Sequence, residues 1–542
     1  DLTAGTVTAS SGTVSSITSP LPKSITTGSN ATVIDLNAKN GSTITYKKSG
    51  DNTSYTLSEG VGGTGKTTFP ANTTIVYIQY IVGSNNAVNI SSTSVTTTNT
   101  FNSSSINANS LSSLSVSGSG TTTLNGSITT SGTQSFTGPV TLGAASTLTT
   151  TDNNITFSNT VNGGFGLTVG AGTGTTTFSG AVGGTSALTS LSVTGTGTTS
   201  IGGGSITTSG TQTYSGPVSL SADTSFTTTN NNLTFNGTVN SSNSTARDLT
   251  ASVGTGSVVF GDSSSDTVGA TNAIKAISIT GGLDLNAAIT SATSLSVSGA
   301  SDLGANVTTS GTQTYTGAIT LSGADRTLTG STITNSSTIT GAGFSLTETG
   351  NAVINGAVSG VNILSISGTT SLGANVTTTG TQTYTGATTL AANTSLSTTD
   401  SNITFSSTVD SGTAAGKTLT ISNGTGDTTF NGAVGGTLAL GNTTLTTDVL
   451  TANAIKLQGT LNITNTGTSS ITGVIADGAS AALLTKAGSG TLTLSGNNTY
   501  TGATTVSAGT LAVTANNALG TNAAGTTVAS GDRKSTRLNS SH

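Results

Sequence analysis

The stretch SGTQTYSGPVSL (Ser209–Leu220) contains the unit on which the fold of this chain depends. Each copy of the unit places an aromatic residue before a Ser or Thr and a Gly, and then continues as a strand-like alternation. Internal repetition of this kind is typical of solenoids and related arrays. The other copies are SGTQSFTGPVTL (Ser131–Leu142), SGTQTYTGAITL (Ser310–Leu321), TGTQTYTGATTL (Thr379–Leu390) and a looser NNTYTGATTV (Asn497–Val506).

The spacing of these copies is irregular. The repeat glutamines Gln134, Gln212, Gln313 and Gln382 are separated by 78, 101 and 69 residues. Between them recur shorter units that read as strands of roughly three to six residues, bounded by Gly, Asn or Ser. No window carries the apolar stripe of an amphipathic helix. The sequence therefore predicts an all-β chain.

Composition separates this chain from disordered and from ordinary globular proteins. Only 6% of its 542 residues are charged, against about 25% in a typical domain. Disordered chains are usually highly charged and poor in β-branched residues, whereas this one is rich in Thr, Val and Ile, which favour pleated sheet. It has 5 prolines and no cysteine. We expect continuous sheet that needs no disulfides.

Aromatic residues make up 4% of the chain, too few for the cores of immunoglobulin-like sandwiches. A thin core of Val, Leu, Ile and Thr is what a coil of short strands encloses. We predict an elongated parallel β-helix, or β-solenoid, of short irregular repeats, with about 20–25 residues and three strands per turn. Residues 100–531 would form roughly 17–21 turns. Gly and Asn are expected at the corners because both tolerate positive φ.

The C-terminal segment LLTKAGSGTLTLSGNNTYTGATTVSAGTLAV (Leu483–Val513) carries a family resemblance. It is similar to the autotransporter-associated repeat of type V secretion passengers, and more loosely to bacterial β-strand-repeat and filamentous-haemagglutinin-like exoproteins. We expect four of its apolar residues to alternate inward. The matching features are Lys486 before Gly488 and Gly490, the strand Leu492–Leu494, the turn Asn498–Gly502, and Val506, Gly509, Leu511 and Val513; the inward residues are Leu492, Leu494, Leu511 and Val513.

The resemblance implies a secreted or surface-exposed passenger, acting as an adhesin or structural stalk at the bacterial cell surface. Its implied partner is an outer-membrane translocator barrel, which this chain does not contain. Two-partner secretion stays open as the export route. The ligand of such a passenger would be an unknown surface, glycan or host molecule. The net charge of -5 is small and spread out, so neither nucleic acid nor a direct membrane span is expected.

The domain organisation expected from these features has four parts. Residues 1–100 form an N-terminal β-rich module or an atypical solenoid region, residues 101–482 the irregular repeats, and residues 483–531 the autotransporter-associated repeat. The tail Asp532–His542 reads DRKSTRLNSSH and resembles the translation of a common sequencing adapter, so we interpret it as an artefact. The chain has no Met and no signal peptide at Asp1, so we expect a processed product or a fragment.

Two short motifs suggest ligand binding. For both we prefer the interpretation that the motif binds no ligand. Gly60–Thr67 reads GVGGTGKT, which matches the phosphate-binding loop, but that loop must open a helix, and Pro70 and a β-branched strand follow instead. Asp262 and Asp266 in GDSSSD would bind a cation at most weakly, so we expect a solvated loop. No cofactor and no metal is predicted.

Two side-chain arrays of the sequence are candidates for binding surfaces. The aromatic residues of the repeats would form a sugar-binding stripe if exposed, but wedges at a corner of the coil are expected. Ice-binding arrays need Thr at a strict short period, which the sequence lacks. The repeat aromatics are Phe136, Tyr214, Tyr315, Tyr384 and Tyr500.

Catalytic residues are scarce, so we predict that the chain is not an enzyme. A Ser–His–Asp arrangement needs a histidine, and the only one is His542 in the tail. The two glutamates, Glu59 and Glu348, are far apart in sequence. The alternative is a β-helix polysaccharide lyase or hydrolase, in which Asp, Lys or Arg cluster on one face. Arg247 and Arg326 are the only arginines outside the tail, and no acidic cluster accompanies them.

Overall fold

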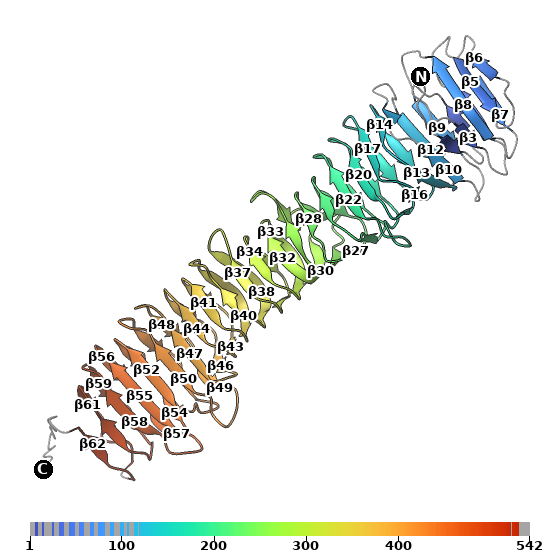
Figure 1. The fold of residues 1–542 in the computed structure, drawn as a ribbon. Coiled ribbons are helices and arrows are strands. Elements are labelled where there is room, and N and C mark those ends of the chain that lie inside the picture. The colour runs from blue at the N-terminus through green and yellow to red at the C-terminus, as the bar shows by residue number, and fades with distance from the viewer. Residues whose placement is uncertain are drawn as a thin grey trace, which may run out of the picture. The chain divides into compact units, whose positions relative to one another are not determined.

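The computed structural model describes residues 113–116, 119–521 and 523–529 with their side chains, and assigns strands alone at several ranges between residues 6 and 117. The chain divides into two compact units, Asp1–Thr293 and Ser294–His542. No helix occurs in the described residues, and the strands of both units build a parallel β-solenoid of about 20 turns (Figure 1). The predicted fold class and the expected number of turns are confirmed.

Most turns consist of three short strands, and the fourth strand starts the next turn. In a few turns one long strand replaces two short ones: β30 (Arg247–Phe260) pairs with both β27 (Thr224–Thr227) and β28 (Leu233–Phe235). In the first unit β25 (Gln212–Tyr214) stacks in parallel on β22, with Leu191 opposite Gln212. In the second unit β45 (Gln382–Tyr384) stacks on β42, with Leu364 opposite Gln382. The strands of these two turns are β22 (Ser190–Thr194), β23 (Thr199–Ile201) and β24 (Ser205–Thr207), and β42 (Leu364–Ile366), β43 (Thr370–Leu372) and β44 (Val376–Thr378).

The number of residues per turn varies while the strands stay in register. Groups in contact on successive turns are separated by as few as 17 residues, as for Asn362 and Thr379, and by 25 for Asn393 and Thr418. Between Ser241 and Ala273 the separation reaches 32 residues. The extra residues lie in the connections between strands, so the irregular spacing of the sequence repeats is absorbed at the corners.

In most strands side chains alternate between the interior and the surface, with breaks in a few strands such as β41 (Val358–Val361). Most three-residue strands bury their first and third residues and leave the middle one partly exposed, as in β45. The interior is filled by Val, Leu, Ile and Thr, and in three runs of three successive turns it also holds stacked aromatic rings. Phe136, Phe157 and Phe178 stack with ring centroids 5.4 and 5.2 Å apart. Such contacts add about 0.5–1.5 kcal/mol per pair beyond the area they bury.

Some corner glycines lie where the main chain of the neighbouring turn leaves no space for a side chain. A Cβ at Gly386 would lie 2.3 Å from the carbonyl oxygen of Gly368, and one at Gly216 would lie 2.4 Å from that of Gly197. Neither Gly386 nor Gly216 has a positive φ. The explanation expected from the sequence, tolerance of positive φ, is therefore wrong at these corners, where the close approach of two main chains excludes any larger residue.

The Asn and Asp residues of the corners act mainly through their side-chain oxygens. Asn154 Oδ1 accepts the backbone N–H of Thr175 on the following turn at 2.8 Å. In most of these contacts the earlier turn supplies the acceptor and the later turn the donor; Asn498 reverses this direction. Positive φ, the expected property of the corners, does occur at twenty described glycines, such as Gly172 and Gly424. Among the described residues other than glycine it occurs at Asp152, Asn230, Ala342 and Asp400. The same contact joins Asn232–Ser257, Asn306–Thr327, Asn375–Ser395, Asn402–Asp427 and Asn442–Thr460.

Strands assigned before residue 112 include antiparallel pairs, unlike those of the solenoid. β5 (Thr43–Lys48) pairs antiparallel with β6 (Ser54–Ser58) and with β8 (Thr74–Ile81). The lysine and threonine of the GKT motif lie in the strand β7 (Gly65–Phe69), not at the start of a helix. The division at residue 100 stays a prediction, and the tail Asp532–His542 lies outside the described residues.

Candidate functional site

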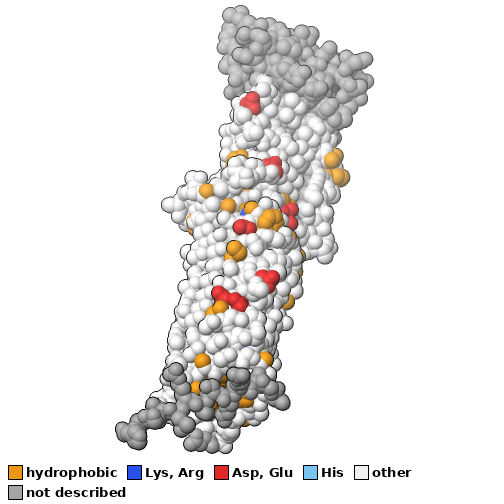
Figure 2. Space-filling model, turned by 90° about the vertical axis from the view of Figure 1, so that its left-hand side faces the viewer, with side chains coloured by type: hydrophobic (Ala, Val, Ile, Leu, Met, Phe, Trp, Pro, Cys, Tyr) orange, Lys and Arg blue, Asp and Glu red, His pale blue; other side chains and the backbone are white. Residues whose placement is uncertain are grey.

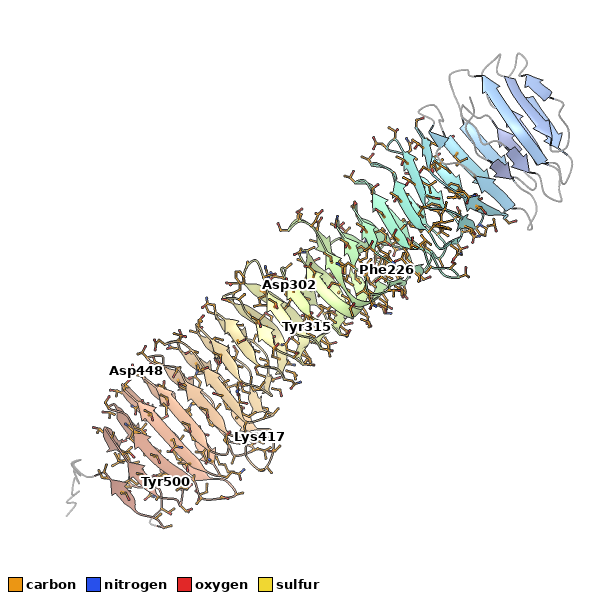
Figure 3. All side chains as sticks on the ribbon, in the orientation of Figure 1. Phe226, Asp302, Tyr315, Lys417, Asp448 and Tyr500 are labelled. Carbon is orange, nitrogen blue, oxygen red and sulfur yellow. The ribbon has the colours of Figure 1, made fainter. Side chains whose placement is uncertain are left out.

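The repeat aromatics are interior residues and do not form a surface stripe. Phe136, Tyr214, Tyr315 and Tyr384 have no exposed surface, and Tyr500 is 1% exposed. Figure 3 places Tyr315 within the stack of strands and Lys417 at its edge. The sugar-binding alternative is therefore wrong for these residues, and they are part of the core. Rings of the neighbouring turns stack on three of them: Phe136 on Phe157 at 5.4 Å, Tyr214 on Phe235 at 5.2 Å, and Tyr384 on Phe405 at 4.9 Å.

The glutamine of each SGTQ unit is the centre of a buried hydrogen-bond network. Gln212 is fully buried, and its Nε2 lies 2.8 Å from the carbonyl oxygen of Thr227 on the next turn. The same nitrogen lies 3.2 Å from the carbonyl oxygen of Ile206 and 3.3 Å from Oγ1 of Thr208. A buried amide must be hydrogen-bonded. The glutamine meets this need with acceptors in its own corner and on the next turn, so it stabilises the corner and the contact between the two turns. Gln134, Gln313 and Gln382 repeat these contacts.

The aromatic residue two positions after the glutamine determines whether the glutamine Oε1 has a hydrogen-bond donor. The phenols of Tyr315 and Tyr384 donate to Oε1 of Gln313 and Gln382 at 3.1 and 3.0 Å. Phe136 occupies the corresponding position in the first copy and has no hydroxyl, and Oε1 of Gln134 is buried without a partner. Sequence reasoning identified the repeat but not this function of its glutamine.

Lys486, in the C-terminal segment, is also an interior residue. Its side chain has no exposed surface, and its ammonium donates to the carbonyl oxygens of Ala487, Gly488 and Ala508 at 2.6, 3.0 and 3.3 Å. Burial lowers the pKa of the Lys486 ammonium. A Cβ at Gly509 would lie 2.9 Å from its Nζ, so the glycine leaves space for the cation. The lysine is a structural cation at a corner.

The rest of this segment largely has the expected alternation. Leu492 and Leu494 in β59 (Thr491–Leu494) are fully buried. Leu511 and Val513 in β61 (Thr510–Val513) stack on them in register, but Leu511 is half-buried and Val513 is 48% exposed. The expected inward position of Val513 is wrong: β61 pairs with β59 on one side, and none of the described strands stacks on its other side.

The two arginines in the part of the chain that the structure describes, Arg247 and Arg326, lie on different strands of the solenoid. Arg326 is 9% exposed, and its Nε donates to the carbonyl oxygens of Leu303 and Ser322 at 2.9 and 3.1 Å. Its guanidinium also contacts the carbonyl oxygen of Asp325 at 3.3 Å. Burial lowers the pKa of Arg326, and the charges of Asp325 and Asp302 oppose that shift. Arg326 therefore satisfies main-chain carbonyls. Arg247 begins the strand β30 (Arg247–Phe260), and its Nε is buried without a partner.

The carboxylates are dispersed. Asp262 is exposed and Asp266 partly exposed on the loop after β30, and no group of three or more potential metal ligands occurs in the part of the chain that the structure describes. Glu59 and His542 lie outside the described residues. Glu348, in contrast to the exposed Asp262, is fully buried in the core. On the face shown in Figure 2, acidic side chains are spread along the surface and do not gather into one large patch.

The outward residues of the strands form regular columns of hydroxyl groups. In the first unit Ser135, Thr156, Thr177, Ser200 and Ser219 are directly opposite one another on successive strands. The period that the sequence lacks is thus present in space, one side chain per turn at the strand spacing of about 4.8 Å. A second column, termed the outer hydroxyl column, runs along the second unit: Thr347, Ser365, Thr383, Thr404, Thr429, Thr451, Ser470 and Thr493.

Comparison with known proteins assigns the C-terminal segment to a family. Residues 484–513 match the family model described as Passenger-associated-transport-repeat. No curated protein and no solved structure is matched by the chain. No helix in the described residues is long and apolar enough to span a membrane. The repeat and the parallel solenoid fit an autotransporter passenger with its associated repeat, as the sequence resemblance predicted.

Proposed function

We propose that this chain is a non-catalytic passenger, secreted or held at the bacterial cell surface, where it acts as an adhesin or a structural stalk. The observation that carries the proposal is the match of residues 484–513 to the passenger-associated repeat, on strands that continue the solenoid. An exported passenger implies a translocator partner in the outer membrane. Deletion of the gene and its full-length restoration test the localisation and the function together.

The outer hydroxyl column supports the adhesin over a passive stalk. Its members are polar, partly or fully exposed and repeated once per turn, so a ligand with repeated polar groups would meet many weak contacts at once. Linked weak contacts raise the overall affinity strongly without any single tight site. A glycan or another hydroxyl-rich surface is the chemical class of ligand that fits such a column.

A charge-substitution experiment separates the two functions. Glutamate at Thr383, Thr404 and Thr429 introduces repulsion and bulk into the outer hydroxyl column. The matched control places glutamate at Ser395, Thr420 and Thr444, which are outward residues of another column in the same unit. If the chain is an adhesin that uses the outer hydroxyl column, only the substitutions at Thr383, Thr404 and Thr429 abolish attachment. The amount of protein displayed at the cell surface should be the same for both variants and the parent chain. Equal attachment of both variants and the parent chain contradicts the adhesin and leaves the stalk.

The enzymatic alternative has its own test. A β-helix lyase or hydrolase would cleave members of a panel of acidic and neutral polysaccharides. We expect no cleavage, because Arg326 is occupied by main-chain carbonyls and the described carboxylates do not converge. Release of unsaturated or reducing ends by the purified chain would overturn the non-catalytic proposal.

A further inference from the structure

An acid and an amide face each other in the core of the second unit. Glu348 lies in β40 (Leu346–Ile354) and Asn335 at the end of β38 (Arg326–Asn335), and neither has exposed surface. Asn335 Nδ2 donates to Glu348 Oε1 at 2.7 Å. The second oxygen of each group, Glu348 Oε2 and Asn335 Oδ1, is buried without a partner. The two unpartnered atoms thus belong to two side chains already in contact.

The surroundings do not compensate a negative charge at this position. An ionised carboxylate accepts hydrogen bonds only, so it leaves Asn335 Oδ1 without a donor. The titratable groups on the neighbouring strands are Tyr315 on β36 (Thr312–Tyr315) and Arg326 on β38. The phenol of Tyr315 donates to Gln313, and the guanidinium of Arg326 binds carbonyl oxygens. The two strands of the next turn that pair with β40, β42 and β43, carry no titratable side chain. A buried, unpaired charge is very costly.

We propose that Glu348 is a neutral carboxylic acid in the folded solenoid, and that its proton links Oε2 to Oδ1 of Asn335 in a ring closed by two hydrogen bonds. The ring forms by uptake of one proton from water as the carboxylate enters the core. One proton then satisfies both of the unpartnered oxygens. Folding of the turns that contain β38 and β40 is therefore coupled to protonation of a single side chain.

The direction of the resulting pH dependence follows from burial. Burial raises the pKa of Glu348 from 4.5 to about 7, although the hydrogen bond from Asn335 opposes the shift. An acid whose pKa is higher in the folded than in the unfolded chain stabilises the fold fully below the unfolded value. That contribution is lost as the pH rises through about 7. A passenger that folds after export would thus form these turns more readily in a mildly acidic medium.

Carboxyl NMR tests the protonation directly. The chain contains two glutamates, Glu59 and Glu348, so ¹³C-labelled glutamate gives two side-chain carboxyl signals. Glu348→Gln removes one and Glu59→Gln removes the other, and the second variant assigns the spectrum even if the first does not fold. We expect the Glu348 signal of the folded chain to be that of a neutral acid at pH 5.5. Titration of both signals in the ordinary glutamate range overturns the proposal.

Denaturant unfolding between pH 5 and pH 8 tests the coupling to folding. Glu348→Gln is the matched variant, because its amide donates to Asn335 Oδ1 at every pH. We expect the unfolding constant of the parent chain to rise over this range by about 100-fold relative to the variant. An identical pH dependence of the two proteins would show that no proton is taken up at Glu348. If the Glu348→Gln variant does not fold, the NMR titration of the parent chain is the deciding measurement.

Discussion

The phenol of Tyr384 donates a hydrogen bond of 3.0 Å to Oε1 of Gln382, two residues earlier on the same strand. In the first repeat Phe136 replaces the tyrosine, and Gln134 Oε1 is unpartnered. We expect Tyr384→Phe to lower the free energy of unfolding by about 1–3 kcal/mol, because it leaves a buried acceptor unsatisfied. Phe136→Tyr is the reciprocal change and should stabilise the chain. Denaturant midpoints check both, and a loss of stability on adding the hydroxyl would contradict the explanation.

Buried threonines with unpartnered hydroxyls are sites for stabilisation. Thr388 is 1% exposed, and its Oγ1 has no partner. Thr388→Val should raise the free energy of unfolding by about 1 kcal/mol, since it removes an unsatisfied polar atom at constant shape. Thr378→Val is the control, because that hydroxyl donates to Gly380 and accepts from Gln382. The two variants should shift the urea midpoint in opposite directions, and equal shifts would exclude a role for the hydroxyls.

The glycines between turns are expected to be irreplaceable where main chains touch. Gly216→Ala would place a Cβ 2.4 Å from the carbonyl oxygen of Gly197, and overpacking of this kind costs about 1–3 kcal/mol. Gly164→Ala serves as the control, because nothing lies within 4 Å of the added atom. Thermal unfolding of the two variants should differ accordingly. Similar melting temperatures would mean that the turns separate to admit a methyl group.

Lys486 should stabilise the C-terminal turns although its charge is buried. Lys486→Met removes the donor to three carbonyl oxygens, at an expected cost of about 2–4 kcal/mol. Because burial lowers its pKa, the unfolded chain binds more protons in the alkaline range. The stability of the parent chain should therefore rise with pH there relative to the variant. Lys417→Met, at a partly exposed residue, is the control and should leave the urea midpoint unchanged.

The repeat at residues 483–531 is predicted to act as a folding template for the turns before it. Contacts in a solenoid run mainly between adjacent turns, and β58 (Leu483–Ala487) and β59 pair with the preceding turn through β55 (Thr460–Asn465) and β56 (Thr468–Ile471). Unfolding of residues 100–531 with and without residues 483–531 measures its contribution. An internal deletion of equal length is the control, and an equal loss in both would make the segment an ordinary turn.

The sequence by itself determined the class of fold and the kind of turn. Short β-branched alternations between Gly and Asn, few aromatics and a recurring SGTQ unit predict three-stranded turns, because each of these signals depends on neighbouring residues alone. The passenger repeat was visible for the same reason, since Lys486, Leu492 and Tyr500 lie within one short segment. The inward direction of Leu492 follows from the two-residue period of a strand.

Only the tertiary structure decided which residues meet across turns. A shift of one residue in register turns every side chain to the opposite face. Because the corners differ in length, the register between turns cannot be predicted from the number of residues between two strands. The hydroxyl column through Thr383 and Thr404 becomes regular only when the strands are stacked. Likewise Glu348 and Asn335 are 13 residues apart on different strands, and nothing local marks them as partners. Their burial creates a protonation site because the solenoid interior excludes the water that would otherwise solvate the acid.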